Sequence, residues 1–404
     1  MELKDLLLEE SRRIKEQIVC WRREIHRHPE VGLALPHTAE IVERVLTQLG
    51  LEPKRTGGEG VTGITAVIQG GCPGPVILLR ADMDALPMEE ENHLPFRSEI
   101  PGVAHMCGHD THTAMLLGAA ALLTRFRQEL RGNVKLMFQP GEEGYNGAGR
   151  MIEHGLLEEP RVDGAIAMHC LTGSRWKTGT VLCAVEGPAK ASADAFRIDV
   201  RGRGTHGATP EQGVDVVDTL SQLVQGLYRI RSRELSAFTP AVLSVCQIHA
   251  GTVDNILPES GYITGTFRTF DETVRKLCRR RIEEIAGHTA AARGAEASVT
   301  FHGGLHPTLN DPVLCPQVFS YVRELVGEEN TDVIGPVTGA EDFSEISRRV
   351  PSVYLDISFG SGAEGYPEGV HSPRCLFNEE ALPVGAACYA WCALRWLQDR
   401  GGQE

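Results

Sequence analysis

Apolar side chains recur along the chain with the spacing of helices in some segments and of strands in others. From residue 2 to residue 28 they return at steps typical of one face of a helix, and Pro29 is expected to close this helix. A second helical run extends from Thr111 to Arg127, with Thr111 expected as its N-cap. Short apolar runs of strand character lie at 63–68, 76–81, 133–138 and 164–169. This alternation predicts an α/β fold, an open mixed sheet with helices on both faces.

The region 184–297 follows a different order of elements. A strand-like segment, AFRIDVRG, precedes a helical run at 213–233, and two strand-like segments separate that run from a second one at 271–292. The strand-like segment ASVTFHGG comes last. The order β-α-β-β-α-β is that of ferredoxin-like α+β domains. We therefore predict a main domain in two parts, residues 1–183 and 298–404, with this smaller domain inserted between them.

Composition narrows the class of protein. The chain has 404 residues, of which 42% are hydrophobic, and this is enough for two domains. Its formal net charge of −14 disfavours nucleic acid as a partner, and it has no apolar run long enough for a membrane span. The N-terminal segment is charged throughout and lacks the features of a secretory signal, so a cytoplasmic location is expected. The 11 cysteines are scattered singly, which argues against a disulfide framework.

Side chains suited to metal binding stand at the ends of several strand-like runs. They occur in RADMDAL (80–86), HMCGHDTH (105–112), FQPGEEG (138–144), AIAMHC (165–170) and GVHSP (369–373). Each segment alone also has a structural interpretation: the acids as turn caps or a solvated pair, Cys107 as a buried thiol. For His112, inside the predicted helix, packing is favoured over metal binding. Together the segments favour a metal site, since thiolate, imidazole and carboxylate all bind divalent metals.

The adjacent acids Glu142 and Glu143 indicate the chemistry. Hydrolysis of an amide at neutral pH needs an activated water, and a metal lowers the pKa of bound water to about 7 while a nearby carboxylate takes the proton. One of the two glutamates can then bind metal while the other acts as the base. Two ions in such a site would lie about 3.5–4 Å apart and share a bridging ligand.

A set of motifs in this order resembles a known family. The motifs are RADMDALP, HMCGHDTHTAMLLGAA, FQPGEEGYNGAGRMIEHG, GRGTHGATPEQGVD, GTVDNILPE, TGAEDFS and HSP. Between about residue 18 and residue 395 the chain resembles the metallo-aminoacylase and carboxypeptidase superfamily. The resemblance is to the branch of hippurate hydrolases, N-acyl-amino-acid amidohydrolases and auxin-conjugate hydrolases. It implies a metal-dependent amidohydrolase that cleaves the amide bond of N-acyl amino acids, with the main domain catalytic.

The resemblance also implies roles for residues at matching positions. Cys107 is expected to bridge two divalent metal ions, with one ion completed by Glu143 and His371 and the other by His109 and His169. The remaining implied roles are Glu142 as general base and proton donor, Asp82 as an acid that orients a metal ligand, His206 as an oxyanion-stabilising residue, and Asn255 and Arg268 as substrate-binding residues. Each of the last three also has a structural interpretation: a backbone hydrogen bond for His206, a turn for Asn255 and a salt bridge for Arg268.

Other features remain open at this point. Thiolate and imidazole ligands suit zinc best, but manganese, cobalt and nickel stay possible. The inserted domain resembles a lid and dimerisation domain, which implies a homodimer and a hinge near Gly187 and Pro188. The segment VGLALPHTAE departs from the family's usual pattern and leaves Pro36 and His37 unassigned. The rival interpretations are a metallocarboxypeptidase or dipeptidase acting on short peptides, and a catalytically silent binding protein of the same fold.

Overall fold

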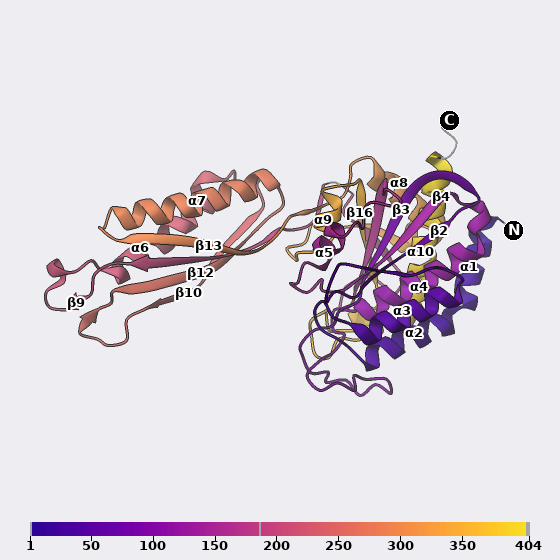
Figure 1. Cartoon of the computed structure of the whole chain (residues 1–404), viewed down its shortest axis with the longest axis horizontal. Coiled ribbons are helices and arrows are strands. Elements are labelled where there is room, and N and C mark those ends of the chain that lie inside the picture. The colour runs from indigo at the N-terminus through magenta and orange to yellow at the C-terminus, as the bar shows by residue number, and fades with distance from the viewer. Residues whose placement is uncertain (1, 186, 401–404) are drawn as a thin grey trace. The chain divides into compact units, whose positions relative to one another are not determined.

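The computed structural model describes residues 2–185 and 187–400, and within them the chain forms two compact units. Unit 1 contains the chain up to Ala189, Leu309–Gly335 and the chain from Asp342 onward. Unit 2 contains Lys190–Thr308 and Pro336–Glu341. Unit 2 is thus inserted into unit 1, and each unit has its own layers of helices and strands (Figure 1).

Unit 1 is built on a mixed sheet. In the described residues this sheet has eight strands in the order β1-β2-β4-β3-β5-β16-β6-β15. They are β1 (Lys54–Thr56), β2 (Gly63–Gln69), β3 (Cys72–Asp82), β4 (Arg131–Gln139), β5 (Gly164–Leu171), β6 (Val181–Cys183), β15 (Thr331–Val333) and β16 (Ser352–Ser358). The neighbouring strands β4, β3, β5 and β16 run parallel, so their carboxyl ends meet at one edge of the sheet.

Helices cover both faces of this sheet, as Figure 1 shows. They are α1 (Leu3–Arg13), α2 (Lys15–Arg27), α3 (Pro36–Gln48), α4 (His109–Arg125), α5 (Gly147–Glu153), α8 (Leu314–Val326), α9 (Ser344–Ser347) and α10 (Leu382–Arg400). Successive residues of β3 point to opposite faces. Leu79 belongs to a core with Met115 of α4 and Cys388 of α10, whereas Leu78 belongs to a separate core with Met151 of α5.

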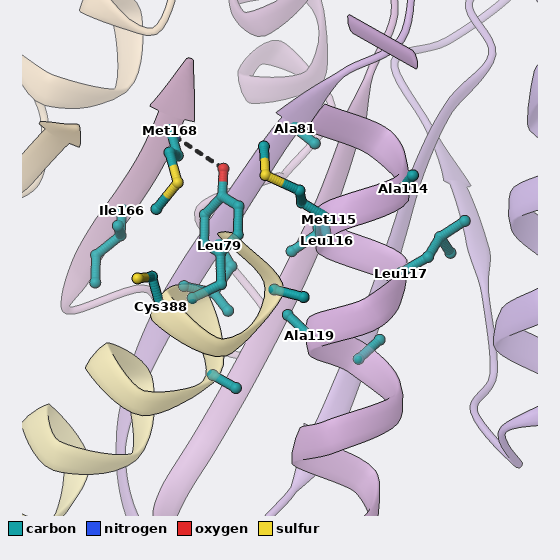
Figure 2. Close-up of a cluster of buried hydrophobic side chains, with 14 of the residues drawn as sticks. Leu79, Ala81, Ala114, Met115, Leu116, Leu117, Ala119, Ile166, Met168 and Cys388 are labelled. Carbon is teal, nitrogen blue, oxygen red and sulfur yellow. Dashed lines mark hydrogen bonds between the residues drawn. The ribbon is translucent and has the colours of Figure 1, made fainter. Parts of the chain in front are cut away.

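Figure 2 shows the first of these cores, where α4 and α10 lie against β3 and β5. Its dashed line is a buried hydrogen bond that the backbone N–H of Met168 donates to the Tyr389 hydroxyl, over 2.8 Å. The same hydroxyl donates to the carbonyl oxygen of Arg80 over 2.7 Å. Helix α10 is therefore bonded to both β3 and β5 close to the sheet edge where the candidate ligands stand.

Unit 2 has a second sheet, covered on one face by two helices. Its elements are β8 (Ala193–Arg201), α6 (Val216–Arg229), β10 (Ala241–Ala250), β12 (Ser260–Thr269), α7 (Glu272–Ala291) and β13 (Glu296–Leu305). In the described part of the unit the four strands are antiparallel in the order β10-β12-β8-β13, which is the ferredoxin-like arrangement. Ile198, Phe267 and Ile282 are buried in its core. The predicted α/β fold with an inserted ferredoxin-like domain is confirmed.

The predicted boundary at residue 297 lies too early in the chain. It falls inside β13, which pairs with β8 from Glu296 to Leu305, so the inserted unit continues to Thr308. A further piece, Pro336–Glu341, also belongs to unit 2. On the N-terminal side, β7 (Pro188–Lys190) pairs with β14 (Thr308–Leu309) where the chain passes between the units, next to the predicted hinge.

Two predicted helices begin or end at other residues. The run 2–28 is two helices, because the backbone of Ile14 (ψ 6°) interrupts the first helix. The apolar period continues across this break, since residues of both helices belong to the same core. Helix α4 begins at His109 rather than after Thr111, because Gly108 in the left-handed region (φ 86°) allows an earlier start.

The described residues can be compared with two expectations from composition, on membrane-spanning helices and on cysteines. None of the helices in residues 2–185 and 187–400 is long and apolar enough to cross a membrane. Each cysteine of the chain lies in the described residues and is a free thiol, with Cys20, Cys72 and Cys246 exposed and the others buried.

Candidate metal centre

The parallel strands of unit 1 bring the candidate ligands to one edge of the sheet. β3 ends at Asp82, β4 is followed by the loop with Glu142 and Glu143, and His169 lies near the end of β5. Cys107 precedes the first turn of α4. Since the strands run parallel, segments distant in sequence meet where open α/β sheets generally bind ligands.

Cys107 and His371, 264 residues apart in the chain, are in direct contact. The Nε2 atom of His371 lies 3.3 Å from the Cys107 sulfur and 3.2 Å from Oε1 of Glu143. His371 has a left-handed backbone (φ 66°), which is unusual outside glycine, and its N–H donates to the carbonyl oxygen of Met106 over 2.7 Å. The backbone at His371 is therefore held in a strained form next to the cluster, as is common at functional sites.

Cys107 also forms a group with His169 and His109. The Nδ1–H of His169 donates to the carbonyl oxygen of Cys170 over 2.7 Å, which leaves Nε2 as a lone pair 3.5 Å from the sulfur. His109 is fully buried, and neither of its ring nitrogens has a hydrogen-bond partner among the described residues. Buried imidazole nitrogens normally have partners, so His109 is suited to a ligand other than a protein group.

Glycine is required between the two candidate ligands of the CGHD motif. Gly108 has a left-handed backbone, and a β-carbon built on it would lie 2.2 Å from the Cys170 sulfur. A larger residue would force apart the helix start and β5, and the positions of Cys107 and His109 would change with them.

Asp82 is the centre of a buried network next to the candidate ligand His109. It accepts from Nη1 of Arg80 over 2.7 Å and from Nδ1 of His112 over 2.5 Å. Nε2 of His112 in turn accepts from the N–H of Cys170 over 2.8 Å, which fixes the His112 tautomer and agrees with its expected packing role. Burial would raise the pKa of Asp82, but Arg80, His109 and His112 hold it well below its usual range. Asp82 thus stays ionised and holds β3, α4 and β5 together.

Asp84 is a candidate functional residue to which the sequence motifs gave no role. Its two carboxylate oxygens accept from the backbone N–H groups of Glu142 and Glu143, over 2.9 and 3.0 Å. Its Oδ1 also lies 3.5 Å from Nδ1 of His109. Asp84 thus positions both glutamates and one candidate ligand. The sequence feature that could have indicated a role for Asp84 is its position two residues after Asp82, at the end of the same strand-like run.

Charge within the cluster is strongly coupled. Hydrogen bonds to Cys107 and then Glu143 raise the pKa of His371 to about 10. Burial would raise the pKa of Glu143, but His371 and His109 lower it. Burial would lower the pKa of His109, yet the charges of Asp82 and Cys107 raise it well above its usual value. The same acidic groups that stabilise the protonated forms of His109 and His371 would also attract metal cations.

The donor set fits divalent metal ions. Ligand atoms of two groups, Cys107 with His109 and His169, and Cys107 with Glu143 and His371, lie within 4.8 Å of one another. A third group joins His109 to Glu142 and Glu143. Only Cys107 occurs in both of the first two groups, the position that a bridging ligand would take. Thiolate, imidazole and carboxylate together suit zinc and the later first-row metals.

The remaining site candidates lie in unit 2. His206 is exposed in β9 (Thr205–His206), which pairs with β11 (Ile256–Leu257), and Asn255 adjoins it through a hydrogen bond from the N–H of Gly207 to its carbonyl oxygen, over 2.8 Å. Arg268 is half-buried in β12, between the buried residues Phe267 and Thr269, and so points away from the helices. The structure therefore brings His206 and Asn255 together.

The segment with the unassigned Pro36 and His37 contacts the glutamate loop. Pro36 is the first residue of α3, and Glu30 accepts from the N–H of His37 over 3.1 Å. Tyr145 follows Glu143 in the same loop, and a β-carbon placed on Gly32 would lie 3.3 Å from the Tyr145 ring. The segment after Pro29 thus lies against the loop that carries Glu142 and Glu143.

The fold and the donor set together define a class of protein. A mixed α/β sheet that gathers a thiol, imidazoles and carboxylates at the ends of its parallel strands is the framework of a metal-dependent hydrolase.

Comparison with known proteins gives the family. The chain belongs to peptidase family M20/M25/M40, whose family model matches residues 78–395. It is 36% identical over 402 residues to thermostable carboxypeptidase 1 of Saccharolobus solfataricus, which covers 98% of this chain and 99% of that protein. N-acyl-L-amino acid amidohydrolase of Geobacillus stearothermophilus is 40% identical over 300 residues, or 74% of this chain and 79% of that protein.

A solved structure agrees with the family. The Bacillus subtilis YXEP protein, described as a dinuclear metal binding peptidase from the M20 family, matches with a TM-score of 0.82 and 30% identity, covering 96% of this chain and 99% of that one. The resemblance inferred from the motifs is confirmed. The chain is a metal-dependent hydrolase that acts on amide bonds.

Proposed function

We propose that this protein hydrolyses the amide bond of N-acyl amino acids. In this proposal Cys107, His109, Glu143, His169 and His371 hold two divalent metal ions, zinc by preference. The observation that carries it is the contact of Cys107 with both His169 and His371, which lie 62 and 264 residues further along the chain. The 40% identity to an N-acyl-L-amino acid amidohydrolase supports the substrate class.

Glu142 is the proposed general base and later the proton donor. It stands beside Glu143 and His109 in one group of potential ligands, and Asp84 holds its backbone. When bound, the metal ions would supply an activated water and polarise the amide carbonyl. The Glu142 carboxylate would accept the proton of that water and deliver it to the leaving nitrogen.

His206 is the proposed donor to the oxyanion. Its Nδ1 accepts from the N–H of Ala208 over 3.0 Å, so Nε2 carries the proton in the neutral ring and can donate. Fixed donors of this kind are usually the largest contribution to acyl-transfer catalysis. Arg268 would pair with the substrate carboxylate, and Asn255 would add a polar contact. Unit 2 thereby has the role of a lid that carries these groups to the substrate.

The rival substrate class is short peptides, because the chain is also 36% identical to a thermostable carboxypeptidase. Acylated amino acids present an apolar acyl group, whereas dipeptides present a free amine. We expect metal-free protein, reloaded separately with zinc, manganese, cobalt or nickel, to hydrolyse N-acetyl and N-benzoyl amino acids faster than dipeptides. Release of the free amino acid measures both rates. Faster dipeptide hydrolysis would replace the proposal with the rival, and inactivity on every substrate would favour a binding protein.

We also propose that the protein is a homodimer through unit 2. Strand β10 is an edge strand of ten residues, and Val242 and Ile248 on it are 43% and 52% exposed. A long apolar edge favours pairing with another strand, and two copies of β10 could pair about a two-fold axis.

Light scattering tests the dimer. We expect a mass of twice the 44.0 kDa chain, and a shift to the single-chain mass when Val242 and Ile248 are both replaced by lysine. Val333→Lys, on an exposed valine of unit 1, is the matched control and should leave the mass unchanged. A single-chain mass for the parent protein would refute the dimer.

A further inference from the structure

We infer that Arg22 and His26 of α2 are positioning residues for the candidate metal ligands, because together they hold Asp110 at the start of α4. The inference rests on the proposed function in one respect, the assignment of Cys107 and His109 as ligands. It adds two residues of α2 to the groups that hold these candidate ligands in place.

Arg22 and His26 converge on one carboxylate oxygen. Nε of Arg22 donates to Oδ2 of Asp110 over 2.7 Å, and Nδ1 of His26 lies 2.8 Å from the same oxygen. All three side chains are almost completely buried, with exposed fractions of 1%, 1% and 0%. The two residues are one helical turn apart, so they occupy the same face of α2. The other oxygen, Oδ1, has no hydrogen-bond partner among the described residues.

Arg22 and His26 each make a second contact, on the side away from Asp110. Nη1 of Arg22 donates to Glu379 over 3.1 Å, and the Arg22 guanidinium lies 5.0 Å from the centre of the Phe96 ring. Nε2 of His26 lies 3.3 Å from Oε2 of Glu90, which in turn accepts from the backbone N–H of Ser98 over 2.8 Å. Neither group can therefore follow Asp110 if α4 moves, and the contact sets the position of the helix start.

Asp110 transmits this constraint to the ligands. It is the second residue of α4, immediately after His109 and three residues after Cys107. A buried ion pair restrains its partners because the loss of one partner leaves an uncompensated charge. The ring of His109 has no hydrogen-bond partner within the described residues, and its nearest carboxylates, Asp84 and Asp82, lie 3.5 Å from Nδ1 and 3.8 Å from Nε2. The position of the His109 backbone is set by the turn that Asp110 anchors.

Arg23 provides a matched control on the same helix. It also pairs with Glu379, through Nε at 3.0 Å and Nη2 at 2.5 Å, but no contact joins it to Asp110 among the described residues. Arg22→Gln and Arg23→Gln therefore remove the same kind of group and share one partner, and they differ in the contact with Asp110.

The test is zinc affinity, measured by chelator competition on metal-free protein, together with the thermal midpoint of the metal-free form. Arg22→Gln and His26→Gln are expected to weaken zinc binding by about 10- to 100-fold, the range for outer-shell partners of metal ligands. Saturating zinc should restore most of kcat with KM unchanged. Arg23→Gln should bind zinc as the parent protein does.

Two results would overturn the inference: folded Arg22→Gln protein with the parent's zinc affinity, or equal weakening by Arg23→Gln, which would assign the effect to Glu379. If Arg22→Gln does not fold, Arg22→Lys and His26→Gln decide by the same measurement. The proposed function fails separately, when the parent protein and Cys107→Ala bind zinc equally.

Discussion

Glu142→Gln is expected to lower kcat by about 100- to 10,000-fold while the protein keeps its metal ions. Glutamine has the shape of glutamate but cannot accept the proton of the attacking water. The backbone N–H of residue 142 would still donate to Asp84, so the loop should keep its position. The measurement is kcat on an N-acyl amino acid, alongside the metal content of the same sample.

Glu143→Gln is the matched control for this prediction. It changes the adjacent residue in the same way, but Oε1 of Glu143 lies 3.2 Å from Nε2 of His371, among the candidate ligands. This variant should lose metal affinity first and activity as a consequence. Near-normal turnover by metal-loaded Glu142→Gln protein would show that another group is the base.

Cys107→Ala is expected to weaken the binding of both ions by more than about 100-fold, beyond the upper end of the loss caused by outer-shell changes, and to abolish turnover. The sulfur lies 3.5 Å from Nε2 of His169 and 3.3 Å from Nε2 of His371, so both halves of the cluster lose a donor. Metal content after dialysis against a chelator, measured by elemental analysis, checks this prediction.

Cys388→Ala separates the loss of a ligand from the loss of a buried thiol. Cys388 is fully buried in α10, in the core that Figure 2 shows, and is not in the groups that join Cys107 to His109 and His169 or to Glu143 and His371. The variant should lower thermal stability and keep the metal ions. A Cys107→Ala protein that retained both ions would remove the basis for a bridging thiolate.

The fold could be predicted where apolar residues recur at a regular spacing within a single segment. The strands near 63–68 and 133–138 and the order of elements in unit 2 follow from such periods. The break at Ile14 could not be predicted, because both helices bury the same stripe of residues. The boundary at 297 was wrong because β13 belongs to unit 2 through its pairing with β8, about 100 residues earlier, and pairing is not visible in a single strand.

The candidate ligands were recognisable because their residue types are chemically distinctive and stand at strand ends. Asp84 was not assigned a role, because its partners are backbone N–H groups of residues 142 and 143, which carry no sequence signal. Arg22 and His26 were not singled out for a similar reason. A charged residue on an amphipathic helix usually faces water, and only the packing of α2 against α4 shows that these two are buried.

The position of β16 in the sheet has a consequence for the growing polypeptide. β16 lies between β5 and β6, although both of those strands precede unit 2 in the chain and β16 follows it. The ribosome must therefore release nearly the entire sequence before β5 and β6 acquire the neighbour that joins them, and His371 emerges later still. Until then an apolar strand edge is open to wrong partners, so this enzyme has a long interval during synthesis in which chaperones would protect it.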